Sequence, residues 1–218
     1  MLVLAFTLGM RHGVDPDHLV VIDGLSRLRP GRWNGVLFAI GHGLAVTTIA
    51  VGVGSFLADL LEPLSPWLLF SLGILNLWRL FFPDHSHPVK LVSTNPLLLG
   101  VLFAAGFETA SQLSALALTS TINPWLIGAA FSLGMLVVDG IDGYLAARTQ
   151  VTFSKLRSQW PSRCLGVVVV VFSFSIGGAD LLGANWEGLS FPLGVGLFVL
   201  IIALRIWSRW SSNSEAKA

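Results

Sequence analysis

Charged side chains are scarce in this sequence. Asp, Glu, Lys and Arg make up 11% of its 218 residues, whereas hydrophobic residues make up 54%. So few polar residues cannot cover the surface of a water-soluble globule, which excludes a soluble protein. The net charge of +1 provides no strongly basic surface, so we expect no nucleic-acid partner. Cysteine is also nearly absent, and the single Cys164 excludes a disulfide within the chain.

The hydrophobic residues gather in long runs that are bounded by proline, glycine and charge. These runs lack the two-residue alternation of outer-membrane strands, so we expect transmembrane helices and an all-α integral membrane protein. About seven spans are predicted, at residues 1–25, 34–59, 66–82, 96–120, 124–147, 164–183 and 190–208. We expect one transmembrane domain, residues 1–210, and a polar cytoplasmic tail, residues 211–218.

The basic residues predict the orientation of these spans. All but one of the 13 Lys and Arg residues fall at the ends of the first, third, fifth and seventh spans, and the exception is Arg11. These ends share one side, which is the cytoplasm by the positive-inside rule. We therefore expect a multi-pass protein of the cytoplasmic membrane, with its N-terminus outside and its C-terminus inside.

The first predicted span contains an unusual polar motif. Residues 12–18 read His-Gly-Val-Asp-Pro-Asp-His, and Arg11 and Asp23 lie close by. One charge at the centre of a span costs about 2.5 to 3.5 kcal/mol, so a bound cation is expected to compensate. Imidazole mixed with carboxylate suits Ni²⁺, Co²⁺, Zn²⁺ or Fe²⁺ better than Mg²⁺ or Ca²⁺. The alternative is a closed polar network in which Arg11 pairs with Asp15 and the histidines bond to the backbone.

Proline within the motif predicts a broken helix. His12, Asp15 and His18 share one face of an ideal helix, whereas Asp17 points away from His12. Pro16 cannot donate to the carbonyl of His12, so the helix should kink or unwind there. Broken backbone at membrane depth is tolerated only inside protein or beside a wet cavity. The motif should therefore mark a substrate path.

Other spans contribute further polar side chains. His42 lies between two glycines in the second span, which lets a ligand approach it closely. Glu108 and Gln112 are four residues apart in the fourth span, and Asp139 and Asp142 are three apart in the fifth, so each pair projects from one helix face. We interpret all five as candidates for the ion path. Structural hydrogen bonding within the bundle is the alternative.

Two short matches indicate an inverted three-helix repeat. Phe38-Ala-Ile-Gly-His42 resembles Phe131-Ser-Leu-Gly-Met135, and Phe6-x-x-Gly9 resembles Phe103-x-x-Gly106. Three spans separate the copies, so the copies would have opposite topology, as in many secondary transporters. Chance similarity between apolar helices is the alternative.

Four segments resemble the signatures of the nickel/cobalt transporter family, in family order. Arg11-His-x-x-Asp-x-Asp-His18, followed by Ile22-Asp23 and Arg27, resembles its His-x₄-Asp-His signature. The other three segments are Phe38-x-x-Gly41-His42, Gly106-Phe-Glu-Thr-Ala110 and Gly134-Met-x₃-Asp139-x₂-Asp142-Gly143. The chain is similar to the compact members, because its first motif is on the first span. Glu108, Gln112 and Gly140 depart from the usual Asp, Glu and Thr, which leaves the preference between nickel and cobalt open.

The resemblance implies a secondary transporter, or permease, for Ni²⁺, with Co²⁺ as a further candidate substrate and uptake as the expected direction. The expected metal ligands are His12, Asp17, His18 and His42. The residues expected to orient these ligands or line the path are Arg11, Asp15, Asp23, Glu108, Gln112, Asp139 and Asp142. The metal ion and the lipid bilayer are the expected partners. No catalytic residue and no organic cofactor are expected, and the oligomeric state is left open.

Three other functions compete with uptake. An exporter of the same fold would tend to have a longer His-rich cytoplasmic loop than Asp84-His-Ser-His87. An intramembrane metalloenzyme would need a positioned base, and no His-Glu-x-x-His motif occurs. A membrane accessory protein for urease or hydrogenase maturation is the third. The chain has no Gly-x₄-Gly-Lys-Ser/Thr loop, so it carries no ATP motor of that type.

Overall fold

The computed structural model describes residues 1–51, 62–82, 95–104, 121–153, 160–184 and 187–215. This part of the chain is helical and contains no strand, as the sequence predicts. It holds a short 3₁₀ turn, η1 (Glu62–Leu64), and eight α-helices: α1 (Leu2–His12), α2 (Pro16–Leu28), α3 (Asn34–Ala50), α5 (Ser65–Phe81), α6 (Pro96–Phe103), α8 (Pro124–Phe153), α9 (Trp160–Leu181) and α10 (Glu187–Glu215).

Three of these helices are long and apolar enough to cross a membrane. Their membrane-length stretches are Pro124–Thr152, Ser162–Leu181 and Gly188–Trp207. α1 and α3 are shorter apolar helices. The chain is therefore a multi-pass membrane protein. The predicted spans 34–59 and 96–120 continue beyond α3 and α6 into residues outside the described part of the chain.

The first predicted span consists of two helices. α1 ends at His12 and α2 begins at Pro16, which confirms the break expected from the proline. Asp15 precedes the proline in an extended conformation, with ψ 146°, as steric contact with the proline ring requires. Proline is favoured at the first helical position because its missing N–H would have no partner there. The break therefore falls at residues 13–15, immediately before Pro16.

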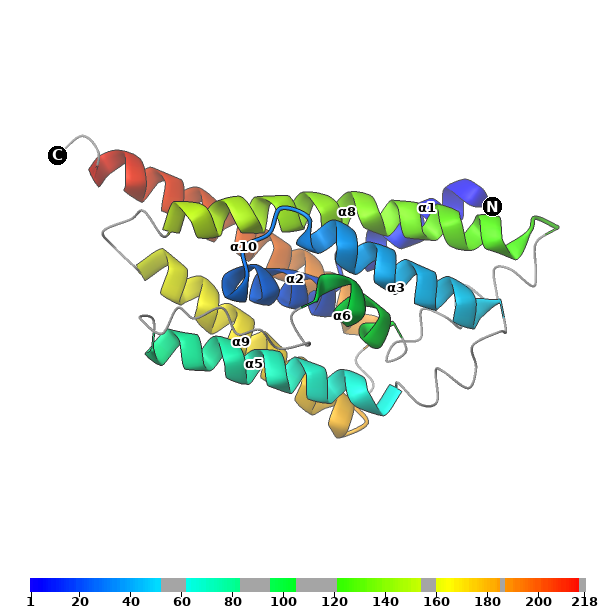
Figure 1. Cartoon of the computed structure of the whole chain (residues 1–218), viewed down its shortest axis with the longest axis horizontal. Coiled ribbons are helices and arrows are strands. Elements are labelled where there is room, and N and C mark those ends of the chain that lie inside the picture. Colours follow the sequence, from blue (N-terminus) through cyan, green and yellow to red (C-terminus); the bar gives the residue numbers. More distant parts are fainter. Residues whose placement is uncertain (52–61, 83–94, 105–120, 154–159, 185–186, 216–218) are drawn as a thin grey trace.

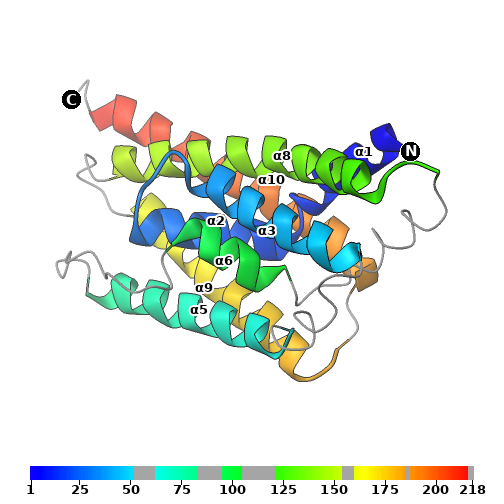
Figure 2. The same ribbon diagram turned by 45° about the vertical axis from the view of Figure 1, so that its right-hand side comes forward.

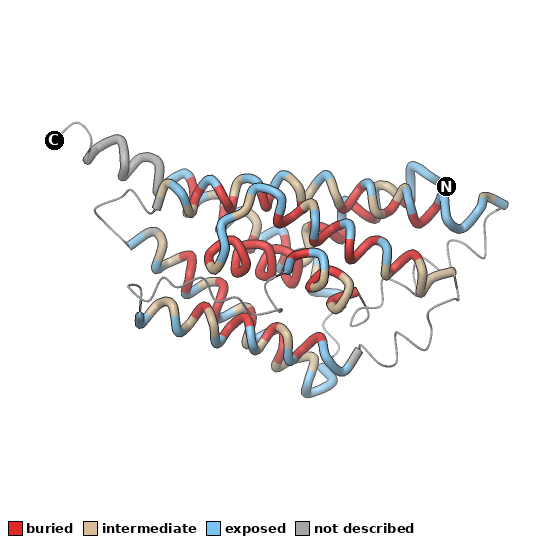
Figure 3. The backbone as a smooth tube through the Cα atoms, viewed as in Figure 1, coloured by how far each residue is buried: buried red, intermediate tan, exposed pale blue. Residues whose placement is uncertain are grey.

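α2 lies at the centre of the bundle (Figures 1 and 2). Every residue from Pro16 to Arg27 is buried, so this helix has no face toward lipid (Figure 3). Its apolar side chains, among them Leu19 and Ile22, belong to a core cluster that includes Phe38 of α3 and Leu165 of α9. The central helix of the fold thus carries the second half of the polar motif.

The two ends of the described chain lie at opposite ends of the bundle (Figure 1). α1 begins at one end, whereas α10 finishes at the other. α10 continues to Glu215, so a helix extends through most of the segment predicted as a polar tail, residues 211–218.

Glycines bring α1 and α8 into backbone contact. A Cβ added at Gly9 would collide with the carbonyl oxygen of Phe131, and a Cβ at Gly134 would collide with that of Phe6. In both Phe-x-x-Gly segments, the backbone carbonyl of the phenylalanine thus lies against the glycine of the other segment. Close approach of this kind is how small residues stabilise helix pairs in membranes.

The same reciprocal contact recurs between α3 and α6. A Cβ at Gly41 would collide with the carbonyl oxygen of Leu97, and a Cβ at Gly100 would collide with that of Phe38. The inverted repeat inferred from the sequence would pair these helices in this way, and it stays a prediction. The segment of α6 that takes part is Leu97-x-x-Gly100, not the Phe103-x-x-Gly106 match, whose Gly106 is outside the described residues.

Candidate metal site

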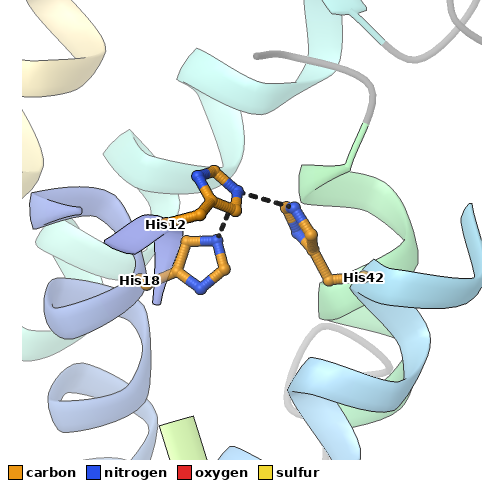
Figure 4. A group of neighbouring side chains, drawn as sticks. All are labelled: His12, His18 and His42. Carbon is orange, nitrogen blue, oxygen red and sulfur yellow. Dashed lines mark hydrogen bonds between the residues drawn. The ribbon is translucent and has the colours of Figure 1, made fainter. Parts of the chain in front are cut away.

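Three histidines from three helices meet in the interior of the bundle (Figure 4). His12 comes from the end of α1, His18 from the first turn of α2 and His42 from the middle of α3. All three are buried, and one ligand atom of each lies within 4.8 Å of those of the others. The break at residues 13–15 lets His12 and His18 approach the same point from different helices.

The Nε2 atoms are the atoms that converge. His12 Nε2 lies 3.1 Å from His18 Nε2 and 3.2 Å from His42 Nε2. Two nitrogens bound at about 2.1 Å to one ion are about 3.0 Å apart at a right angle and about 3.4 Å apart at a tetrahedral angle. Both separations from His12 lie between these limits, so His12 is spaced from each of the other two rings as two ligands of a single ion are.

Carboxylates contact the Nδ1 atoms of two of these rings. His12 Nδ1 lies 2.8 Å from Asp15 Oδ2, and His18 Nδ1 lies 3.1 Å from Asp139 Oδ2. An ionised carboxylate can only accept a hydrogen bond, so where the carboxylate is ionised, Nδ1 of the neutral ring is the donor and Nε2 keeps a lone pair. Two lone pairs then face each other at 3.1 Å. A cation between them removes the repulsion, and carboxylate–histidine pairs of this kind support metal sites.

Asp17 borders the histidines. It is 2% exposed, and its Oδ2 lies 4.0 Å from His18 Nε2. That oxygen accepts no hydrogen bond from any residue in the described part of the chain. Of the four ligands expected from the sequence, the structure thus brings the three histidines together and leaves Asp17 at the edge of the group.

Arg11 does not take part in this network. Its side chain is exposed, and its Cζ lies 5.3 Å from the centroid of the Phe191 ring. Among the described residues Asp15 Oδ2 bonds to His12, not to Arg11, and its other oxygen accepts from Ser190 Oγ at 3.4 Å. In this structure Arg11 therefore does not neutralise Asp15, and its expected place in the ion path stays a prediction.

The remaining expected residues divide into two groups. Asp23 and Asp142 are buried, and both pair with Arg205 instead of a histidine. Glu108, Gln112 and the Asp84–His87 segment lie outside the described residues.

Arg205 is the residue that sequence reasoning missed. It is 4% exposed and lies within α10, although the sequence places it at the basic end of the last predicted span. The sequence pointed to Arg205 only indirectly. Two carboxylates within membrane spans need a positively charged partner, and Arg205 is the last basic residue before the end of the predicted span 190–208.

The site lies near the middle of the longest helix. At 1.5 Å per residue, Asp139 is about 22 Å from the start of the 30-residue α8 and about 21 Å from its end. His18, which bonds to Asp139, therefore lies beside the middle of α8, away from both of its ends.

Replacing Asp139 by Asn tests the carboxylate–histidine pair. The amide keeps the shape but removes the charge that orients His18, and loss of such a partner typically lowers metal affinity by about 10- to 100-fold. We expect this weakening in ⁶³Ni equilibrium binding to purified protein. Ser132→Ala on the same helix is the control, because Ser132 Oγ bonds only to the carbonyl of Gly128 among the hydrogen bonds of the described residues. Equal affinity of Asp139→Asn and unmodified protein would remove Asp139 from the site.

Comparison with known proteins identifies relatives along most of the chain. The NicO family model, a high-affinity nickel-transport protein, matches residues 1–70, which contain all three histidines. The hydrogenase nickel incorporation protein HupN of Bradyrhizobium diazoefficiens is 25% identical, over 93% of this chain and 68% of the relative. The high-affinity nickel transport protein of Cupriavidus necator is also 25% identical, over 83% of this chain and 69% of the relative.

The nickel transporter NixA of Staphylococcus aureus is 26% identical, over 83% of this chain and 71% of the relative. No solved structure matches the chain. The matching family and the relatives are nickel transport proteins and not enzymes. The NicO match over residues 1–70 and these relatives, together with the signatures in order and the three gathered histidines, support membership of the nickel/cobalt transporter family.

Proposed function

We propose that this chain is a secondary transporter that carries Ni²⁺ inward across the cytoplasmic membrane, with Co²⁺ as a second substrate. The observation that carries the proposal is the convergence of three imidazole nitrogens at the centre of a helical bundle. His12, His18 and His42 bind the ion, Asp15 and Asp139 orient two of the rings, and Asp17 supplies a nearby negative charge. The N-terminus faces outward in this arrangement.

The chemistry of the ligands supports selection of a transition metal. Imidazole nitrogen binds Ni²⁺ and Co²⁺ well, whereas Mg²⁺ and Ca²⁺ prefer shells of oxygen. A partly dehydrated Mg²⁺ would therefore exchange good oxygen ligands for poorer ones at this site. The nitrogen-rich site thus rejects the divalent ions that are most abundant in cells.

The membrane potential can drive uptake without ATP. A divalent cation that moves down about 100 mV gains about 4.6 kcal/mol, enough for about three orders of magnitude of accumulation. Metal binding also displaces protons from imidazole and carboxylate ligands, so proton movement can accompany transport.

Cells that express the chain test the direction and the substrate. We expect ⁶³Ni accumulation above that of cells with an empty vector, and unlabelled Co²⁺ in excess should reduce it. Mg²⁺ at the same concentration should have no effect. Accumulation below the vector control would mean export, and competition by Mg²⁺ equal to that by Co²⁺ would contradict the assigned ligands.

A second candidate function is suggested by the name of one relative. The Bradyrhizobium protein is called a hydrogenase nickel incorporation protein, so a membrane accessory role in metalloenzyme maturation is the alternative. Purified protein in liposomes separates the two functions. A transporter moves ⁶³Ni into the liposomes without any partner, whereas an accessory protein binds nickel without moving it.

A further inference from the structure

Arg205 of α10 is held between two carboxylates from different helices. Its Nη2 donates to Asp23 Oδ1 and Oδ2 at 2.9 and 3.1 Å, and its Nη1 donates to Asp142 Oδ1 at 2.8 Å. Asp23 and Asp142 are fully buried, and Arg205 is 4% exposed. We call these three residues the Arg205 clamp.

The two carboxyl groups of the clamp have one oxygen more than the hydrogen bonds from Arg205 occupy. Asp142 Oδ2 is buried and has no hydrogen-bond partner among the described residues. Asp23 and Asp142 also place two carboxyl groups against one guanidinium. Burial of a charge is costly unless it is well paired, so a spare carboxylate oxygen at this depth favours a second cation. Carboxylate oxygens are ordinary ligands for divalent ions.

The clamp lies next to the histidine site, on the same two helices. Asp23 follows His18 by five residues on α2, about 7.5 Å, and Asp142 follows Asp139 by three residues on α8, about 4.5 Å. α2 and α8 contact each other, and both run toward the end of the bundle where α10 finishes (Figure 1). An ion that left the histidines toward that end would meet Asp23 and Asp142 next.

We propose that Asp23 and Asp142 form a release site for the divalent cation, and that Arg205 occupies this site until the ion arrives. The positively charged guanidinium of Arg205 takes the place of the ion at the two carboxylates and so closes the cytoplasmic side of the path. The ion passes when it displaces Arg205 from the carboxylates, and the return of Arg205 closes the path again. This inference rests on the transport function proposed above.

A purely structural arginine in the same chain offers a comparison. Arg27 is also 4% exposed, but its side chain donates to neutral acceptors, Asn76 Oδ1 at 3.3 Å and the carbonyl of Ser162 at 2.6 Å. These bonds join α2 to α5 and α9. Helix packing therefore does not require an arginine between two buried acids, and Arg27 serves as the matched control.

The test is the number of metal ions that purified protein binds. Unmodified protein should bind one Ni²⁺ in ⁶³Ni equilibrium dialysis, whereas Arg205→Gln should bind two, because the amide leaves both carboxylates to the metal. Arg205→Gln combined with Asp142→Asn should return to one, and Arg27→Gln should stay at one. A folded Arg205→Gln protein that binds a single ion would overturn the release site.

The second site can be measured apart from the histidines. Mn²⁺ prefers oxygen ligands, so its electron paramagnetic resonance signal reports the carboxylates. Arg205→Gln combined with His42→Ala should still bind one Mn²⁺. If unmodified protein binds no nickel but this double variant binds Mn²⁺, the proposed histidine site fails and the release site stands. If unmodified protein binds one nickel and Arg205→Gln binds no additional ion, the histidine site stands and the release site fails.

A milder variant covers the case in which Arg205→Gln does not fold. Asp142→Asn keeps the pairing of Arg205 with Asp23 but removes half of the release site. We expect ⁶³Ni uptake into liposomes to slow by about 10-fold or more, with nickel affinity within about 3-fold of that of unmodified protein. Uptake at the unmodified rate would overturn the proposal.

Discussion

Cells that express His42→Ala should accumulate ⁶³Ni no faster than cells with an empty vector. His42 contributes one of the three converging nitrogens found in the described part of the chain, and its Nε2 lies 3.2 Å from that of His12. Alanine leaves two imidazoles and a cavity of the size of a ring. Loss of a supporting residue alone lowers metal affinity by about 10- to 100-fold, so loss of a direct ligand should exceed about 100-fold. His12→Ala should have the same effect.

A variant of the same helix controls for expression and folding. Leu44 is two residues from His42, but its side chain is 62% exposed on the outer face of α3. Leu44→Ala should transport at the unmodified rate when both proteins are present at equal levels in the membrane. Normal ⁶³Ni accumulation by His42→Ala and His12→Ala would refute the site.

Gly134→Ala should destabilise the folded protein strongly. The new Cβ would collide with the carbonyl oxygen of Phe6, a backbone atom that cannot move aside as a side chain can. Overpacking typically costs about 1 to 3 kcal/mol and sometimes more, and we expect the upper end of this range. At about 2 to 4 °C per kcal/mol for a chain of this size, Tm should fall by about 10 °C. Thermal unfolding of the detergent-purified protein measures the shift.

The matching variant is Gly196→Ala on α10. No described atom lies within 4 Å of a Cβ built there, so this change should leave Tm within about 2 °C of its unmodified value. Gly100→Ala should behave like Gly134→Ala, because its Cβ would collide with the carbonyl oxygen of Phe38. If Gly134→Ala and Gly196→Ala have the same Tm, the backbone contact between α1 and α8 does not exist as described.

The local features of the site could be predicted from the sequence. Proline chemistry alone predicts the break before Pro16, and the rarity of intramembrane charge directs attention to the 12–18 motif. The convergence of His42 with this motif was also anticipated, because a histidine between glycines can be approached closely. The structure agrees with both expectations.

The division of work among the carboxylates could not be predicted. Asp23, Asp139 and Asp142 are equivalent as residue types, and the contact of α10 with α2 and α8 separates them. Asp23 and Asp142 pair with Arg205 of α10, whereas Asp139 bonds to His18. Asp15 bonds to His12, which lies three residues before it in the chain. Helical spacing fixes which residues share a face, but it does not say which helix covers that face.

The nickel X-ray absorption spectrum of the metal-loaded, purified protein tests the central claim most directly. The account predicts three imidazole nitrogens at about 2.0 to 2.1 Å, with the outer-shell scattering that histidine rings produce. His42→Ala should lose one of the three imidazoles. A shell made entirely of oxygen, or a spectrum that does not change in His42→Ala, would contradict the assignment of His12, His18 and His42 as the nickel ligands.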